Sequence, residues 1–93
     1  MSAAPVELVF YSAPECHLCE IALARAGELA SELGLSLRVV DISNDPDLES
    51  RYRSRIPVAE IEGRTAFKYE VDEARVQRLV AEAHSDPEGR FGP

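Results

Sequence analysis

A short apolar run gives way to a helical pattern early in the chain, and two cysteines stand at the junction. Val6–Tyr11 is rich in β-branched and aromatic residues and is too short for a globular helix, so it predicts a strand. Pro14 ends the strand, because proline cannot continue a sheet ladder. A helical pattern begins at Cys16, and the apolar residues that recur on its predicted inner face are Leu18, Ala22, Leu29 and Leu33. A strand that feeds directly into a helix predicts an α/β fold.

The middle of the chain predicts a second strand and a short helix. Leu35–Ile42 alternates and then becomes fully apolar, which is typical of a strand buried on both faces. Asp45 can cap a helix whose first position suits Pro46. Leu48 and Tyr52 then form the inward stripe of this helix.

The last third predicts a hairpin and a final helix. Val58–Glu62 and Thr65–Tyr69 are short alternating runs separated by Gly63-Arg64, a typical hairpin signal. Asp72 is placed to cap the last helix. The inward stripe of that helix consists of Val76, Leu79, Val80 and Ala83.

The predicted order is therefore β-α-β-α-β-β-α, with a four-stranded mixed sheet and helices on both faces. Ninety-three residues make one domain. We place it at residues 6–84, with flexible ends at 1–5 and 85–93. The first two strands should be parallel, since a helix joins them with a right-handed crossover.

Composition narrows the classes of partner. Apolar residues make up 45% of the chain, as in a folded soluble domain, and the formal net charge is −7. An acidic surface repels phosphate backbones and anionic lipid, so we expect neither nucleic-acid nor membrane binding. The first residues lack the charged and apolar regions of a signal peptide, which predicts a cytoplasmic protein.

The two cysteines, Cys16 and Cys19, predict thiol–disulfide chemistry. In the cytosol disulfides are usually transient, and a bridge across three positions would constrain little unfolded-chain entropy. At a helix start the unpaired amides and the helix dipole stabilise a thiolate, so we expect the pKa of the Cys16 thiol to fall below the free value of ~8.5. Cys19 lies almost one turn deeper on the same side, where it can attack a mixed disulfide on Cys16. Cys16 is thus the expected nucleophile and Cys19 the resolving thiol.

The stretch Tyr11–Cys19, the β-α-β unit, Ile56-Pro57-Val58 before a hairpin and the final helix together resemble the thioredoxin fold. The resemblance is to its glutaredoxin-like branch, in particular to small members with a Cys-His-Leu-Cys site, and it spans about residues 6–84. It implies the same nucleophile and resolving thiol. It also implies a cis Pro57 that faces the cysteines, and a backbone at Ile56 that pairs with an extended substrate segment.

Two residues near this predicted site have open roles. His17, when protonated, would stabilise a thiolate at the neighbouring cysteine and tune its redox potential, or it is a solvent-facing residue at the helix start. Arg55 would place positive charge near the thiolate or bind a carboxylate of a partner, or it is a solvated loop residue.

The expected substrate is a protein or mixed disulfide, and the reductant stays open between a thioredoxin-reductase-type protein and glutathione. Three departures from glutathione-using relatives bear on that choice. The Cys-x-x-Cys motif lacks an internal proline, Ala13 stands where many glutaredoxins have lysine, and Tyr69–Asp72 keeps only the aspartate of a Gly-Gly-Asp pattern. We expect a monomer without a resident cofactor, with glutathione as a conceivable co-substrate.

Other cysteine chemistries fit less well or stay as alternatives. A structural zinc site needs about four protein ligands, and His17 and His84 are the only histidines beside the two cysteines. Haem attachment requires histidine after the second cysteine, where Glu20 stands. An iron–sulfur cluster bridged across a dimer is one alternative function. A redox sensor without turnover is another.

Overall fold

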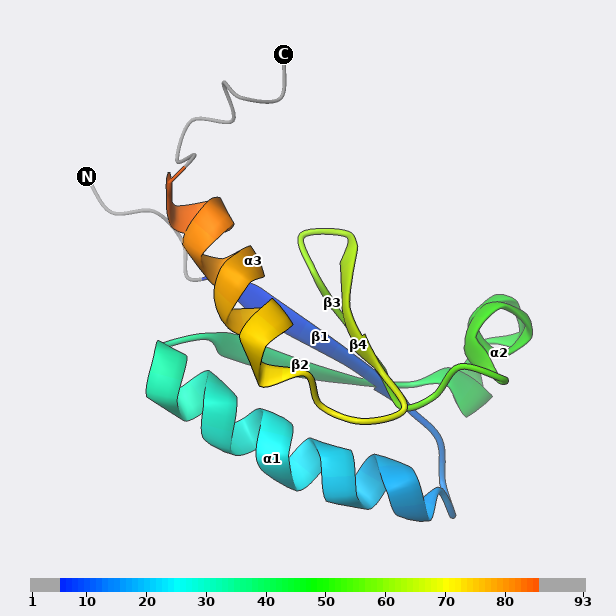
Figure 1. The fold of residues 1–93 in the computed structure, drawn as a ribbon. Helices are drawn as coiled ribbons and strands as arrows, with labels where there is room; N and C mark the ends of the chain where they lie inside the picture. Colours follow the sequence, from blue (N-terminus) through cyan, green and yellow to red (C-terminus); the bar gives the residue numbers. More distant parts are fainter. Residues whose placement is uncertain (1–5, 86–93) are drawn as a thin grey trace.

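The computed structural model describes residues 6–85. The predicted flexible ends at 1–5 and 85–93 lie outside the described residues except for Ser85, which is the last residue of the final helix. Within residues 6–85 the elements follow the predicted order, with one additional 3₁₀ turn (Figure 1). They are β1 (Glu7–Ser12), α1 (His17–Leu33), β2 (Ser36–Asp41), η1 (Ile42–Asn44), α2 (Pro46–Tyr52), β3 (Val58–Ile61), β4 (Arg64–Lys68) and α3 (Glu73–Ser85).

The four strands form one mixed sheet in the order β2-β1-β3-β4. β1 and β2 are parallel, as the helical crossover predicts, and β3 runs antiparallel to both β1 and β4. The hairpin turn lies at Glu62-Gly63, one residue earlier than predicted. Both turn residues have positive φ, 52° and 81°, which is the geometry a two-residue hairpin requires.

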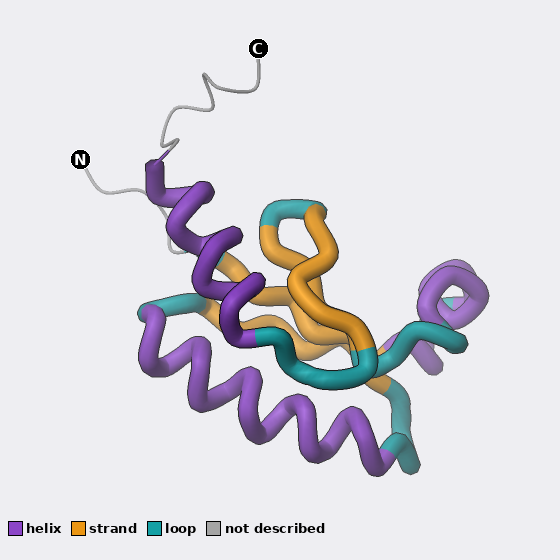
Figure 2. Tube along the Cα trace, viewed as in Figure 1, coloured by secondary structure: helices purple, strands orange, loops and turns teal. Residues whose placement is uncertain are grey.

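Helices cover the two faces of the sheet unequally. Figures 1 and 2 show α1 and α3 on one side of the sheet, while α2 lies apart from them beside the end of β1. The larger core cluster joins α1 and α3 to the sheet, with Leu8, Phe10 and Val76 among its fully buried members. The smaller cluster joins α2 to the other face through Ile42, Tyr52 and Val58.

The helix caps follow the sequence. The Asp45 carboxylate accepts the amides of Asp47 and Leu48, with Pro46 in the first turn of α2. Asp72 accepts the amide of Arg75 at the start of α3. Gly34 ends α1 at φ 70°, a left-handed conformation that glycine adopts without strain.

The predicted double burial of the second strand is wrong. β2 is an edge strand, since β1 is its neighbour on one side and β3 occupies the other side of β1. Val39 is consequently 48% exposed. Ile42 leaves the strand and is buried in η1, where the Ser43 amide donates to the Asp41 carboxylate.

The predicted inner face of α1 is also wrong at Leu18, which is 55% exposed. The buried stripe consists of Cys19, Ala22, Ala26, Leu29 and Ala30. Leu18 precedes Cys19 by about 100° of helical rotation, so it turns away from the sheet. This places a large apolar side chain at the surface between the two cysteines.

Candidate functional site

Cys16 and Cys19 form a disulfide at the start of α1, with their Cα atoms 5.1 Å apart. Cys16 is the N-cap residue with an extended backbone, and the Cys19 amide donates to its sulfur at 3.1 Å. Cys19 is 4% exposed, whereas Cys16 is only partly buried. The sulfur at the helix start is therefore the accessible one, and the other lies one turn deeper.

The loop before Cys16 holds a strained residue. Glu15 has φ 62°, a left-handed conformation that costs a side-chain-bearing residue free energy. Glu15 lies in the turn between β1 and α1, after which the Cys19 amide reaches the Cys16 sulfur. The helix thus begins where the sequence predicts, at a cost in backbone strain at one position.

The Ile56–Pro57 peptide bond is cis, as the resemblance implies, and Pro57 is fully buried. Ile56 is partly buried and packs against both core clusters. Its amide donates to the Tyr52 carbonyl at 3.1 Å, so the carbonyl is the backbone group that Ile56 has left for a partner strand.

His17 and Arg55 are both exposed. The His17 imidazole is 83% exposed and lies 4.0 Å from the Glu20 carboxylate, one turn along α1. The Arg55 side chain makes no ion pair within residues 6–85, while its amide donates to the Tyr52 carbonyl at 2.7 Å. Within residues 6–85 neither side chain forms a hydrogen bond or ion pair with the two cysteines.

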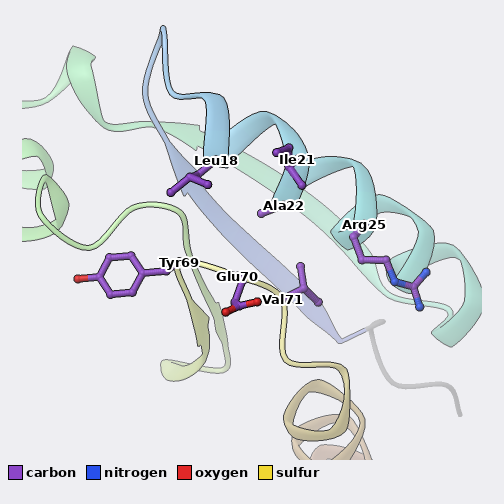
Figure 3. Close-up of a pocket in the computed structure, with 7 residues that line it drawn as sticks. All are labelled: Leu18, Ile21, Ala22, Arg25, Tyr69, Glu70 and Val71. Atoms are coloured by element: carbon purple, nitrogen blue, oxygen red, sulfur yellow. The ribbon is translucent and has the colours of Figure 1, made fainter.

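A groove of about 470 Å³ begins beside the disulfide. We call it the apolar groove; its lining residues are Leu18, Ile21, Ala22, Arg25, Tyr69, Glu70 and Val71. Figure 3 shows the first four along α1 and the other three on the β4–α3 loop that faces them. Sequence reasoning missed this groove, although Ile21 was a signal, being a large apolar residue off the predicted inner stripe.

Tyr69 ties together the two loops that flank the site. Its amide donates to the Pro57 carbonyl at 2.6 Å, and its hydroxyl donates to the Ser54 carbonyl at 2.9 Å. Its φ is 73°, so the residue is held in a conformation that non-glycine residues disfavour. The sequence carried no signal for this connection.

A tyrosine cluster of Tyr11, Tyr52 and Glu60 lies on the α2 side of the sheet. The two rings stack with centroids 4.2 Å apart, and the Tyr52 hydroxyl donates to the Glu60 carboxylate at 2.9 Å. Burial, the neighbouring Tyr52 hydroxyl and the charge of Glu60 raise the pKa of Tyr11 to about 12. Because Tyr52 also accepts the amides of Arg55 and Ile56, the cluster anchors the loop that carries the cis proline.

No group of three metal-ligating side chains gathers anywhere in residues 6–85. Over the same residues, none of the helices has the length and apolar character that crossing a bilayer demands.

Comparison with known proteins gives consistent results. The model of the family described as "Glutaredoxin-like domain (DUF836)" matches residues 7–81. Uncharacterized proteins of Mycobacterium tuberculosis and Mycobacterium bovis are each 31% identical over 86 residues, which is 87% of this chain and 87% of theirs.

Solved structures show the same architecture. The solution structure of protein Ne2328 from Nitrosomonas europaea has a TM-score of 0.72 at 27% identity and covers 85% of this chain and 95% of its own. Thioredoxin 1 from Thermosipho africanus has a TM-score of 0.61 at 11% identity and covers 84% and 98%. At that identity the second likeness shows the fold alone, and the fold is that of thioredoxin.

Proposed function

The chain belongs to the glutaredoxin-like domain family (DUF836), and on that premise we propose that it is a cytoplasmic thiol–disulfide oxidoreductase that reduces protein or mixed disulfides. One observation carries the proposal. Cys16 and Cys19 are bonded to each other at a helix start, with the first sulfur accessible and the second buried. This is the arrangement that two successive exchange steps need.

In the first step the Cys16 thiolate attacks one sulfur of the substrate disulfide. A new S–S bond forms, the substrate S–S bond breaks, and one substrate thiolate leaves. In the second step Cys19 loses its proton and attacks the Cys16 sulfur, which releases the second substrate thiolate. The substrate gains two electrons and the protein becomes the Cys16–Cys19 disulfide.

The helix start assists the attacking sulfur. The Cys19 amide already donates to the Cys16 sulfur, and that donor would stabilise a thiolate in the reduced protein. We propose that His17, one residue on, adds positive charge when protonated, and that Arg55, Ile56 and Pro57 contact the substrate. A thioredoxin-reductase-type protein or glutathione would restore the dithiol, and the working unit would be a monomer.

Burial of the second cysteine favours this function over an iron–sulfur cluster shared across a dimer. A bridged cluster held by protein thiolates alone, without glutathione, would need both thiolates of each chain within bonding distance of iron at an interface. Cys19 is 4% exposed and packs within the larger core cluster. Disulfide exchange uses it without such exposure, since its target is the neighbouring Cys16 sulfur.

Trapping of the mixed disulfide tests the proposal. Cys19→Ser should accumulate a covalent complex with a disulfide substrate through Cys16, visible by mass spectrometry and released by dithiothreitol. Cys16→Ser should form none, and the wild-type dithiol should reduce insulin disulfides. Trapping by Cys16→Ser alone would reverse the assigned roles, and inactivity of the wild-type dithiol towards every disulfide would refute the function.

A further inference from the structure

Large apolar side chains gather at one place on this surface. Four of them are conspicuously exposed within residues 6–85, namely Leu18, Ile21, Val39 and Tyr69. Three line the apolar groove, and Leu18 among them stands between the two cysteines. Exposed apolar side chains that cluster, unlike isolated ones, indicate a surface that another molecule covers.

The charged residues of the groove indicate what charge a bound molecule should carry. Arg25 lies at the end of the groove far from Tyr69 (Figure 3). Three carboxylates already pair with its guanidinium. Its contacts are with Glu28 at 2.8 Å, Glu32 at 3.5 Å and Glu73 at 2.7 Å. The hydrogen bonds to Glu73 and Glu28 raise the pKa of Arg25 above its ordinary value, so the guanidinium is a stably paired charge.

Glu70 is the other charged residue of the lining, and it makes no ion pair or side-chain hydrogen bond within the described residues. Lys68 stands outside the lining, with its ammonium 5.5 Å from the centre of the Tyr69 ring. An occupant of the groove therefore meets apolar carbon and one uncompensated carboxylate. Such a surface disfavours an anionic ligand and favours a neutral or basic one.

A second copy of this chain fits poorly as the occupant. The chain carries a net charge of −7, and a two-fold interface through the groove would place its Glu70 near the same residue of the partner. Glutathione fits poorly too, because its two carboxylates would face Glu70 without a free cation in the lining.

We propose that the apolar groove binds the segment next to the reactive cysteine of a protein disulfide, and that this segment is apolar and neutral or basic. The inference rests on the proposed function and names its substrate class. Docking along Leu18 and Ile21 would bring a neighbouring disulfide to the accessible Cys16 sulfur. Substrate choice then comes from the groove, and bond exchange from the cysteines.

Single-turnover reduction of matched peptide disulfides tests the inference. The pre-reduced protein is mixed with one of two peptides that differ only in the residues beside the cysteine, which are leucine and lysine in one and aspartate in the other. A small disulfide without a peptide, hydroxyethyl disulfide, reports on the cysteines alone. We expect the first peptide to react about tenfold faster than the second, as the burial of one or two apolar side chains implies.

Two substitutions, each with a control substitution, test whether the groove causes this preference. Ile21→Ser should lower the rate with the apolar peptide about fivefold, as a shortened apolar contact implies, and leave hydroxyethyl disulfide unchanged. Val39→Ser is the matched control, since Val39 is 48% exposed on the distant edge strand, and it should change neither rate. Glu70→Lys should speed reaction of the aspartate peptide, whereas Glu7→Lys should not.

The outcomes separate this inference from the proposed function. Suppose that the protein reduces hydroxyethyl disulfide but reduces both peptides at equal rates, or that Ile21→Ser has no effect. Either result would refute substrate binding by the groove and leave the proposed function standing. Inactivity towards all three substrates would overturn the function. In that case NMR with a peptide in which serine replaces the cysteine tests whether the groove binds the segment. Shifts at the Ile21 and Val71 amides would support it, and their absence would overturn it.

Discussion

The apolar groove and the tyrosine cluster lie on opposite sides of one sheet, and they use aromatic and charged residues in opposite ways. In the tyrosine cluster the Tyr52 hydroxyl has a carboxylate partner, and its ring is stacked and 6% exposed. In the apolar groove Glu70 lacks a side-chain partner within residues 6–85, and Ile21 is 57% exposed. The polar and aromatic groups of the tyrosine cluster are paired within the protein, whereas the apolar groove exposes side chains that a partner could contact.

This difference assigns separate tasks to the two regions. The tyrosine cluster holds α2 and the Ile56-Pro57 loop in place, because the Tyr52 carbonyl accepts the amides of Arg55 and Ile56. The groove lies beside the disulfide and remains accessible. Substitutions in the cluster should therefore reduce stability with little change in substrate preference, and substitutions in the groove should do the reverse.

The largest effect is expected from Tyr52→Ala. Tyr52 is 6% exposed, and removing its ring leaves a cavity between α2 and β3 and also breaks the hydrogen bond to Glu60. We expect the free energy of unfolding to fall by about 3 kcal/mol, measured by urea denaturation of the disulfide form. The relative rates with apolar and acidic peptides should stay unchanged in the remaining folded protein. A changed preference would mean that the cluster shapes the groove.

Tyr69→Phe should have a smaller effect, because it removes one hydroxyl and keeps the ring. The lost bond joins the β4–α3 loop to the Ser54 carbonyl. We expect a loss of roughly 1 kcal/mol at most, together with faster hydrogen exchange at the amides of Arg55 and Ile56. Thr65→Val on the same hairpin is the control. Unchanged exchange in Tyr69→Phe would show that the hydroxyl does not steady the loop.

Much of the fold follows from local rules that the sequence displays. Asp45-Pro46 and Asp72 mark helix starts by their own chemistry, and the structure confirms both of them. The strand-to-helix junction at Cys16 follows from the same kind of local signal. These features could be predicted because each depends on residues within one turn of the chain.

The features that were missed depend on contacts between distant segments. β2 is an edge strand because of how β3 pairs with β1, which an apolar run cannot reveal. Glu60 receives the Tyr52 hydroxyl across eight positions and two elements, and the Tyr69 hydroxyl reaches back fifteen residues. The groove depends on the same long-range geometry, so its chemistry could be identified only after the fold.

Backbone strain next to the disulfide predicts a small gain in stability. Glu15 has φ 62°, a conformation that glycine adopts freely. Glu15→Gly should therefore raise the free energy of unfolding by about 0.5 kcal/mol, since relief of strain slightly exceeds the added entropy of the unfolded chain. Glu20→Gly, inside α1, is the contrasting control and should destabilise the protein. A loss of stability in Glu15→Gly would show that the Glu15 side chain makes a stabilising contact that outweighs the backbone strain.

The tyrosine cluster should respond to alkaline pH and show little change near neutrality. The pKa of Tyr11 is raised from 10.0 to about 12, first by burial and then by Tyr52 and Glu60. Between these two values the unfolded chain has lost the phenol proton and the folded chain retains it. The folded state then binds more protons, so the free energy of unfolding falls as the pH rises through this window, and the stabilisation is complete below the lower value.

Ultraviolet absorbance of the phenolate measures this directly. The wild-type protein should show one tyrosine step near pH 12, and Tyr11→Phe should lose that step and weaken the alkaline dependence of stability. At neutral pH the same substitution should change stability little, because the contact of the Tyr11 hydroxyl with Glu60 is long, at 3.5 Å. If the step that Tyr11→Phe removes lies near the ordinary value of 10.0, solvent reaches the cluster, and its contrast with the open groove disappears.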